Sequence, residues 1–490
     1  MIGTGNTQNN YAAFEPLDLG LIGRSSPRAA ANRIKQMPID DALKIVAAAS
    51  AEDAAAVLGM LLNSDDDFSV ALVSEMHPGL AAALLDEGGP ALAALRDVPV
   101  AAEAICRCHD ERKILGLESD IVRRAASSPR GTAGFYRVFA EGVVHWSKQT
   151  GAQATYEPFS SFHRDNGGTG GRLGFPLAEA EVVSAAGRPA GEATRQDFES
   201  ESADPAGHAS VYWTEEHGMF ATWGGIGWHY QRRGGADRFG FPVGPEVAAG
   251  PSRRPGDGDS GWIQPFEKAS IVFTDAVGAI EIWSPIREHF DALDGVTGRL
   301  GFPRGKSHAA GRSPQGTEGR FQRFEGAWDY PEDLVAACIG FDRPGGATIY
   351  TSVHGTYKVD GGIGILYERM GGTPGWLGFP TEDSHRPQND SPTADNQRRV
   401  QTFEGGAIYW SPEHDAVAVR GDVLALLHPE PPVNFFAQLH LGFPTHPEQP
   451  IADGPDMIQF FEHGLITRRA DGIKVWQTVA GSHGSQPPAP

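Results

Sequence analysis

One tetrapeptide returns five times along this chain of 490 residues. Four copies read Leu-Gly-Phe-Pro and one reads Phe-Gly-Phe-Pro, and their prolines are 66, 61, 77 and 64 residues apart. Self-similarity at a nearly fixed period is the signature of a repeat protein, in which each unit buries its apolar face against a neighbour. The chain is therefore expected to fold as a succession of small, similar units.

Each residue of the tetrapeptide has a mechanical role. Glycine permits a backbone bend or a close approach, and proline fixes its own φ and favours an extended conformation in the preceding phenylalanine. The leucine and the phenylalanine can anchor the bend in the core. The motif is thus predicted to form five equivalent corners. These are Leu173, Gly174, Phe175 and Pro176; Phe239, Gly240, Phe241 and Pro242; Leu300, Gly301, Phe302 and Pro303; Leu377, Gly378, Phe379 and Pro380; and Leu441, Gly442, Phe443 and Pro444.

Hairpin patterns accompany the corners. They lie at 138–147, 263–274, 321–331, 400–411 and 458–467, and residues 196–214 read as the same unit with a longer loop. In the clearest case, Val400–Phe403 and Ala407–Trp410 are β-rich runs around Gly405-Gly406, a pair that tolerates the positive φ of tight turns. Short helical patterns, such as the one at 363–370, lie between hairpin and corner. The predicted unit is strand, strand, short helix and corner.

The first 130 residues have a different character. All ten Trp lie beyond them, and they are rich in Ala, Leu, Asp and Glu. Apolar residues at helical spacing, together with Ser50 and Asp53 as a capping box, predict an amphipathic helix at 51–62. Pro38 and Pro78 read as first helical positions. The predicted organisation is a flexible tail (1–27), an all-α helical domain (28–126), a linker (127–134), a mainly-β repeat domain of five units (135–480) and a disordered tail (481–490).

Bulk charge and the ends of the chain limit the partners. The chain has 62 acidic and 41 basic residues and a formal net charge of -21, which argues against nucleic acid and anionic membrane surfaces. No apolar run approaches the roughly 18 residues of a membrane span, and the N-terminus has neither a basic region nor an apolar one. No cleavable export signal is expected, so the protein is cytoplasmic or reaches the envelope by a signal-independent route.

No stretch of the sequence predicts catalysis, a cofactor or a metal. Ser260 lies in a Gly-Asp-Ser-Gly stretch, but that stretch falls in a predicted loop without an evident triad. Cys106, Cys108 and His109 lack the complementary pair that a structural zinc site needs, and three cysteines make no disulfide framework. No G-x-S-x-G elbow is present. The protein is expected not to be an enzyme.

Aromatic residues are the candidate ligand-binding groups. Indole and phenol rings bury large areas, so most of them are expected in the core. The alternative is that rings at non-core positions form platforms on which the apolar faces of sugars stack. The candidate platforms are Trp213, Trp223, Trp228, Tyr230, Trp283, Trp376 and Trp410.

With its five corners and its F-E-G hairpins, the segment from about 131 to 480 resembles the LGFP repeat family. This family is known from actinobacterial cell-envelope proteins, where the repeats accompany mycoloyltransferases and peptidoglycan amidases and are thought to hold them to the wall. The resemblance implies a pseudo-fivefold, propeller-like closed ring. Because hairpins outnumber corners by one, the first hairpin (138–147) and the last (458–476) are hypothesised to complete one blade. Phe239 departs from the usual Leu, and an insertion, DLVAACIGFDRPGG, precedes the fourth corner.

The resemblance implies a non-catalytic protein whose ring recognises cell-envelope glycan or glycolipid. A second hypothesis is a cytoplasmic interaction scaffold, with the helical domain as a docking or oligomerisation module for a protein partner. A third is an accessory protein of a cell-wall hydrolase or acyl transferase. In composition, the helical part also faintly resembles the helical N-terminal domain of magnesium-transporter regulatory regions, over perhaps 70 residues.

Overall fold

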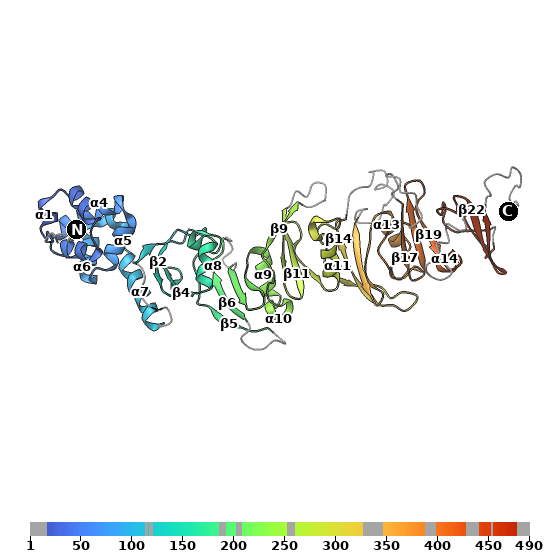
Figure 1. Ribbon diagram of the computed structural model, residues 1–490, viewed down its shortest axis with the longest axis horizontal. Coiled ribbons are helices and arrows are strands. Elements are labelled where there is room, and N and C mark those ends of the chain that lie inside the picture. The colour runs from blue at the N-terminus through green and yellow to red at the C-terminus, as the bar shows by residue number, and fades with distance from the viewer. Residues whose placement is uncertain are drawn as a thin grey trace, which may run out of the picture. The chain divides into compact units, whose positions relative to one another are not determined.

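The computed structural model describes residues 17–112, 116, 121–185, 193–201, 208–251, 260–326, 346–387, 398–427, 441–451 and 454–477 (Figure 1). Residues 1–16 of the predicted N-terminal tail (1–27), the predicted tail at 481–490 and most of the insertion before the fourth corner lie outside these residues. The described part of the N-terminal tail is not flexible as predicted, because residues 21–24 form a helix whose Leu21 and Ile22 are buried in the core. The chain divides into two compact units, Met1–Trp228 and His229–Pro490. Each unit is described by itself.

The first unit begins with short helices. They are α1 (Leu21–Arg24), α2 (Pro27–Ile34), α3 (Ile39–Ala47), α4 (Ala51–Ser64), α5 (Asp66–Ser74), α6 (Pro78–Gly88), the 3-10 helix η1 (Gly89–Leu95) and α7 (Val98–Glu111). The prediction of a helix at 51–62 is confirmed as α4, with Ser50 Oγ accepting the Asp53 amide at 3.2 Å. Pro78 is the first residue of α6, as predicted, whereas Pro38 lies one residue before α3.

Two antiparallel sheets follow in the first unit. Sheet 1 comprises β1 (Arg123–Arg124), β2 (Gly134–Phe139), β3 (Gly142–Ser147) and β4 (Gly151–Tyr156); sheet 2 comprises β5 (Glu181–Val183), β6 (Ala193–Phe198), β7 (Ala209–Thr214) and β8 (Gly218–Thr222). Helix α8 (Phe159–Asp165), η3 (Gly168–Gly170) and the first corner connect them. Helix α9 (Gly224–Arg232) follows sheet 2 and contains the boundary between the two units, and α10 (Gly235–Phe239) belongs to the second unit.

The second unit repeats this arrangement. Sheet 3 comprises β9 (Val247–Pro251), β10 (Ser260–Pro265), β11 (Ala269–Thr274) and β12 (Gly278–Trp283); sheet 4 comprises β13 (His308–Ala309), β14 (Gly319–Phe324), β15 (Ala347–Ser352) and β16 (Gly355–Val359); sheet 5 comprises β17 (Arg399–Phe403), β18 (Gly406–Ser411) and β19 (Asp415–Arg420); sheet 6 comprises β20 (Gln449–Pro450), β21 (Met457–Phe461), β22 (Gly464–Arg469) and β23 (Gly472–Gln477). Helix α11 (Ile286–Ala292) with η4 (Gly295–Thr297), α13 (Gly361–Arg369) and α14 (Gly421–Leu427) precede the third, fourth and fifth corners.

The hairpins predicted at 138–147, 263–274, 400–411 and 458–467 are confirmed, as is the longer unit at 196–214, but the shared blade is wrong. Of the hairpin predicted at 321–331 only residues 321–326 are described, and β14 pairs with β15 at 347–352. The first hairpin belongs to sheet 1 and the last to sheet 6, and each of these sheets has its own outer strands. Among the described residues the strands form six separate sheets, and no strand pairing joins them into a barrel or a propeller. Hairpins outnumber corners because every corner lies between two sheets.

The corners fold as their composition predicts. Their glycines have φ between +65° and +76°, a region that favours glycine. The side chains of Leu300 and Phe302 are buried, as are those at the other corners, and Pro303 forms an antiparallel bridge with Phe324 of the next sheet. The amides of Glu325 and Gly326 donate to the carbonyls of Phe302 and Leu300, both at 2.9 Å. Each corner is therefore held against the first hairpin turn of the following sheet.

A buried glutamine fixes the spacing of consecutive sheets. Gln322 Nε2 donates to the Glu281 carbonyl in β12, at 3.0 Å, and to the Gly305 carbonyl just after the corner, at 2.9 Å. Gln401 does the same toward Lys358 and Glu382. The remaining junctions within the units use Gln196 and Gln459. One side chain thus ties a sheet to both its corner and the sheet before it.

Each sheet therefore has two different faces. In sheets 2 to 6 we call the face with the glutamine the N-side face, because in sheets 2, 4, 5 and 6 it packs toward the preceding sheet, and in sheet 1 we give this name to the face with Phe139 and Val144 that packs on the helices. We call the other face the C-side face. In sheet 5, Phe403 and Ile408 of the N-side face belong to one core with the fourth corner. Tyr409 and Val419 of the C-side face belong to a second core with the fifth corner and sheet 6. Cores thus lie between sheets.

The segment 127–134, predicted as a linker, instead connects β1 to β2 within sheet 1. The helices and this sheet also share one hydrophobic core, to which Ile105 of α7 and Phe135, Phe139 and Val144 of sheet 1 belong. A Ser-Pro-x-Gly-Thr sequence looks like a linker because its residues are typical of turns. Here the turn lies inside a sheet that packs on α7.

Helix α7 provides a corner that the sequence analysis missed. The His109 ring stacks on Phe139 at 4.6 Å, and its Nε2 lies 2.9 Å from the carbonyl of Gly116, whose φ is +76°. His163 has the same relation to Phe198 and to Gly174 of the first corner. Gly116 lies in a Leu-Gly-Leu sequence, which lacks the phenylalanine and the proline. The helical region thus covers sheet 1 as a preceding repeat would.

Gln322→Ala should lower the free energy of unfolding of the second unit by about 2 kcal/mol, because two carbonyls lose a buried donor. Denaturant titration followed by fluorescence measures the change. Gln149→Ala, at an exposed position, is the control and should stay within about 0.5 kcal/mol of the parent protein. Equal effects from the two variants would contradict the role of Gln322.

Candidate functional site

The seven aromatic candidates do not share one environment. Trp228 is exposed, at 46 % of its surface, whereas Trp213, Trp223, Trp283, Trp376 and Trp410 are half-buried. Trp213 and Trp223 pack against one hydrophobic cluster of the first unit, and Trp376 and Trp410 pack against one cluster of the second unit. Trp476, which the sequence analysis did not select, is exposed at 50 %.

Tyr230 is not a platform, and its selection is wrong. The side chain is fully buried, its hydroxyl donates to the Gly240 carbonyl at 2.9 Å, and its ring stacks on Phe266 at 4.6 Å. Tyr367 repeats both contacts with Gly378 and Phe403. Tyr230 is thus the helix residue that locks the second corner, and its place near several Trp in the sequence suggested exposure that the fold does not give it.

Arginine side chains cover three of the predicted platforms. The guanidinium of Arg172 lies 4.0 Å from the centre of the Trp223 ring, and Arg420 lies 4.7 Å from that of Trp376. Arg238 lies 5.3 Å from the Trp283 ring. Cation–π contact of this kind holds each ring in place. One face of each ring is therefore already occupied.

At the fourth corner the arginine and the tryptophan of the cation–π pair exchange places in the sequence. At the first and second corners the arginine directly precedes the motif, and the tryptophan follows or ends the last strand of the next sheet. At the fourth corner Trp376 precedes the motif and Arg420 ends β19. The exchange preserves the contact, which explains why Trp376 stands directly before its motif.

Exchanging Trp376 and Arg420 should lower the free energy of unfolding less than changing Trp376 alone. Trp376→Arg alone brings two cations together and should lower the free energy of unfolding by about 1–2 kcal/mol. Adding Arg420→Trp restores the order found at the second corner and should recover about half of this loss or more. Denaturant titration of the parent, both single variants and the double variant gives the coupling energy. No recovery in the double variant would contradict the pairing.

Glu281 is the acceptor at the centre of a polar network beside the second corner. Its carboxylate accepts hydrogen bonds from His229 Nε2 at 3.0 Å, from Arg238 at 2.6 Å and from Trp283 Nε1 at 2.9 Å. Burial favours the neutral acid, but these donors outweigh burial and lower the pKa of Glu281 to about 2. Glu281 is therefore a charged structural anchor at neutral pH.

Glu281 should make the free energy of unfolding depend on pH in the acidic range. Because its folded pKa lies below its ordinary value of 4.5, its contribution is present above about pH 4.5 and is lost as the pH falls toward 2. Glu281→Gln should therefore cost on the order of 3 kcal/mol at pH 7 and much less at pH 3. Unfolding titrations at several pH values test this. Glu318→Gln, whose parent side chain is 79 % exposed, should show no such trend; a pH-independent cost for Glu281→Gln would contradict the assignment.

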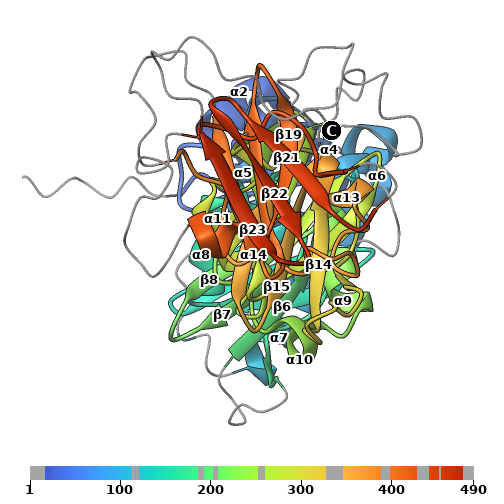
Figure 2. The same cartoon turned by 90° about the vertical axis from the view of Figure 1, so that its right-hand side faces the viewer.

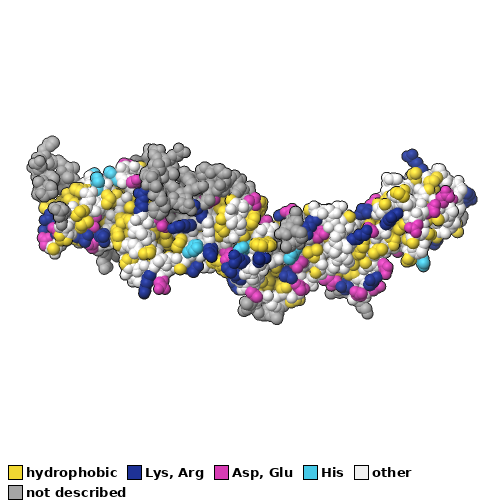
Figure 3. Space-filling view, turned by 180° about the vertical axis from the view of Figure 1, so that it is seen from behind, with side chains coloured by type: hydrophobic (Ala, Val, Ile, Leu, Met, Phe, Trp, Pro, Cys, Tyr) yellow, Lys and Arg dark blue, Asp and Glu magenta, His cyan; other side chains and the backbone are white. Residues whose placement is uncertain are grey.

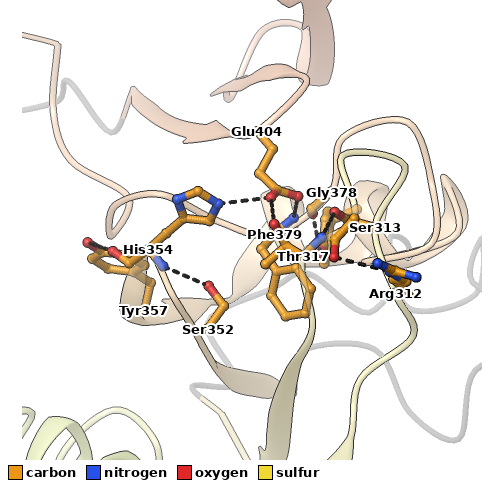
Figure 4. Close-up of polar contacts among 11 residues, drawn as sticks. Arg312, Ser313, Thr317, Ser352, His354, Tyr357, Gly378, Phe379 and Glu404 are labelled. Carbon is orange, nitrogen blue, oxygen red and sulfur yellow. Dashed lines mark hydrogen bonds and ion pairs between the residues drawn. The ribbon is translucent and has the colours of Figure 1, made fainter.

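A buried carboxylate also holds the fourth corner (Figure 4). Glu404 directly follows the corner-pairing Phe403 and is 4 % exposed, and it accepts the Phe379 amide and His354 Nε2, both at 2.8 Å. It also accepts the Thr317 hydroxyl. Burial favours the neutral acid, but the donors lower the pKa of Glu404. A general acid needs the opposite shift, so the geometry favours a structural role.

The loop that delivers Thr317 recurs in the first unit. The Ser313 amide donates to the Thr317 carbonyl at 3.0 Å, and the Ser128 amide donates to the Thr132 carbonyl at 2.9 Å. Thr132 Oγ1 then donates to Glu199 at 2.6 Å, and Glu199 accepts the Phe175 amide of the first corner. At the fifth corner Arg398 takes the place of the loop and binds Glu462 at 2.6 Å. The repeated Phe-Glu pair in the hairpins, which contributes to the family resemblance, was also the sequence signal for this site.

Cys108 and Ser260 were also considered from the sequence. Cys108 is buried, and burial raises the pKa of its thiol, so it is a poor nucleophile. Ser260 begins strand β10, and its side chain lies outside the described part. Among the described residues, no three His, Cys, Asp or Glu side chains gather as metal ligands, and no helix is long and apolar enough to cross a bilayer. On the face in Figure 3, acidic and basic side chains lie among one another rather than in one basic surface.

The comparisons identify the class of the repeats. The family model of the LGFP repeat matches residues 239–298 and 377–427. Each match begins at a corner and continues through the next sheet and helix, so the family's unit is the corner with the sheet that follows it. The chain therefore contains LGFP repeats at these residues, as the motifs indicated. No match is found among curated proteins, and the likeness of the helical region to magnesium-transporter domains stays a prediction.

Proposed function

We propose that the protein is a non-catalytic binding protein whose LGFP repeats recognise a glycan or glycolipid of the cell envelope. The match to the LGFP repeat carries the proposal, because in sequence these repeats resemble those of envelope proteins. The corner carboxylates support a non-catalytic role. Those of Glu281 and Glu404 are saturated by donors that hold them charged in the folded protein.

Trp228 is the candidate that best fits a sugar platform. It lies on α9 and is the most exposed of the seven predicted aromatic residues. An exposed indole stacks on the apolar face of a sugar ring, while carboxylates and amides accept its hydroxyl protons. The excess of acidic residues suits an uncharged, hydroxyl-rich ligand better than an anionic polymer.

The second candidate function is a protein interaction scaffold. Met60 of α4 and Val100 of α7 are exposed at 44 % and 58 %, and these apolar side chains are available to a protein partner. The core that joins α7 to sheet 1 would transmit such docking directly to the first repeat. This function requires no envelope ligand, so localisation and wall binding separate the two.

Purified cell walls should retain the protein, and Trp228→Ala should weaken retention by about tenfold, because one stacked ring contributes about 1–1.5 kcal/mol. Trp228→Phe keeps an aromatic face and is the matched control. Cell fractionation with a wall pull-down provides the measurement. Recovery of the protein only in the cytosol, without wall retention, would instead favour the scaffold function. The non-catalytic assignment would be overturned if the protein turned over peptidoglycan or acyl trehaloses and Glu404→Gln abolished this activity.

A further inference from the structure

The C-side face of sheet 6 differs from the same face of the sheets before it. In strand register, this face carries two rows of residues. They are Phe460, Leu465 and Trp476 in one row and Ile458, Thr467 and Lys474 in the other. Figure 2 shows β21, β22 and β23 side by side and nearest the viewer, with no described element drawn over them.

In sheet 5 the equivalent residues are covered by the fifth corner, α14 and sheet 6. Val400, Ala407, Tyr409, Val417 and Val419 all lie between 0 and 7 % exposed. The same holds in sheet 3, where Val272 and Ile282 share a core with the third corner and sheet 4. Within the second unit, every C-side face that is covered is therefore covered by the same kind of structure. This structure is an LGFP corner together with the N-side face of the sheet that follows it.

Sheet 6 keeps the apolar character of that face, and none of the described residues forms an equivalent cover over it. Trp476 is 50 % exposed, and Ile458, Phe460 and Leu465 are only half-buried. Outward-facing apolar side chains grouped on one sheet typically mark an interaction surface. Lys474 is the one charged residue in these two rows, and it already pairs with Asp471 at 2.7 Å.

The backbone of β23 also repeats an acceptor used at the other junctions. The carbonyls of Glu281, Lys358 and Ala418 accept the buried glutamine of the following sheet. Each of the three residues that carry these carbonyls pairs with the third residue of the strand before it. Ala418, for example, pairs with Ile408 of β18. Val475 lies opposite Ile466, the third residue of β22, so its carbonyl occupies the same place.

We propose that the C-side face of sheet 6 is a docking site for an LGFP module of another polypeptide. That module would place its N-side face on Trp476, Leu465 and Phe460 and donate its glutamine amide to the Val475 carbonyl. A glycan fits less well, because the two rows present no carboxylate or amide side chain for its hydroxyls. The site is separate from the proposed glycan binding at Trp228.

A second copy of this chain is not the expected occupant. The N-side faces of sheets 2, 4, 5 and 6 are already covered within their units, and α7 covers that of sheet 1. On the N-side face of sheet 3, Gln264 and Ile271 are both 0 % exposed. Docking head to tail therefore calls for a module whose N-side face is free. A symmetric pairing of two sheet 6 faces remains as the alternative that the experiment must separate.

The experiment supplies such a module from the chain itself. The full chain is extended after Pro490 by a protease-cleavable linker and a second copy of residues 421–477, in which the copied tryptophan is replaced by phenylalanine. After cleavage the copy should co-elute with the main chain, and acrylamide should quench Trp476 less than in the unextended protein. Trp476→Lys combined with Leu465→Lys in the main chain should abolish both effects, whereas Trp228→Phe should leave them intact.

Release of the copy from the parent sequence, with Trp476 as quenchable as before, would overturn the proposal whether or not the copy is folded. Sedimentation of the unextended chain over a range of concentrations provides the second arm, in which a monomer is expected. A dimer that Trp476→Lys abolishes would assign the face to a second copy and overturn the module assignment. Wall binding that persists in Trp476→Lys keeps this test distinct from the proposed function.

Discussion

The contact between each corner and a buried glutamate organises the repeats. The glycine turns the chain with a positive φ, which brings the following phenylalanine amide onto the carboxylate of the next hairpin, as in Phe379 and Glu404. A side chain at the glycine would collide with that carboxylate; at Gly174 a Cβ would lie 2.9 Å from Glu199 Oε2. Glycine is thus required for two reasons, its positive φ and the absence of a side chain that would collide with the carboxylate. The carboxylate that fits in this space fixes the direction of the next sheet.

Much of this architecture could be read from the sequence, because its signals are local. Glycine and proline at fixed positions predicted the corners, and β-rich runs around Gly405-Gly406 predicted a hairpin that forms as β17 and β18. The capping box at Ser50 likewise needs only its own helix. Each of these features depends on residues that lie within a few positions of one another.

What the sequence did not reveal depends on contacts between distant segments. Tyr230 and Trp228 are two residues apart on one helix, yet one is fully buried and the other is exposed, since only Tyr230 faces the corner. The sixth corner escaped notice because His109 and Gly116 reproduce its geometry without the phenylalanine and proline of the motif. The number of sheets was misjudged for a similar reason, because a hairpin alone does not show which outer strands it recruits.

The core that α7 shares with sheet 1 gives the repeats a direction of assembly. Sheets 1, 2, 4, 5 and 6 each lay their N-side face on a surface formed by residues earlier in the chain, and for sheet 1 that surface is helical. During synthesis the ribosome releases those earlier residues first. Each of these five sheets thus meets a finished template when it emerges, and the N-terminal helices are the template on which sheet 1 orders itself.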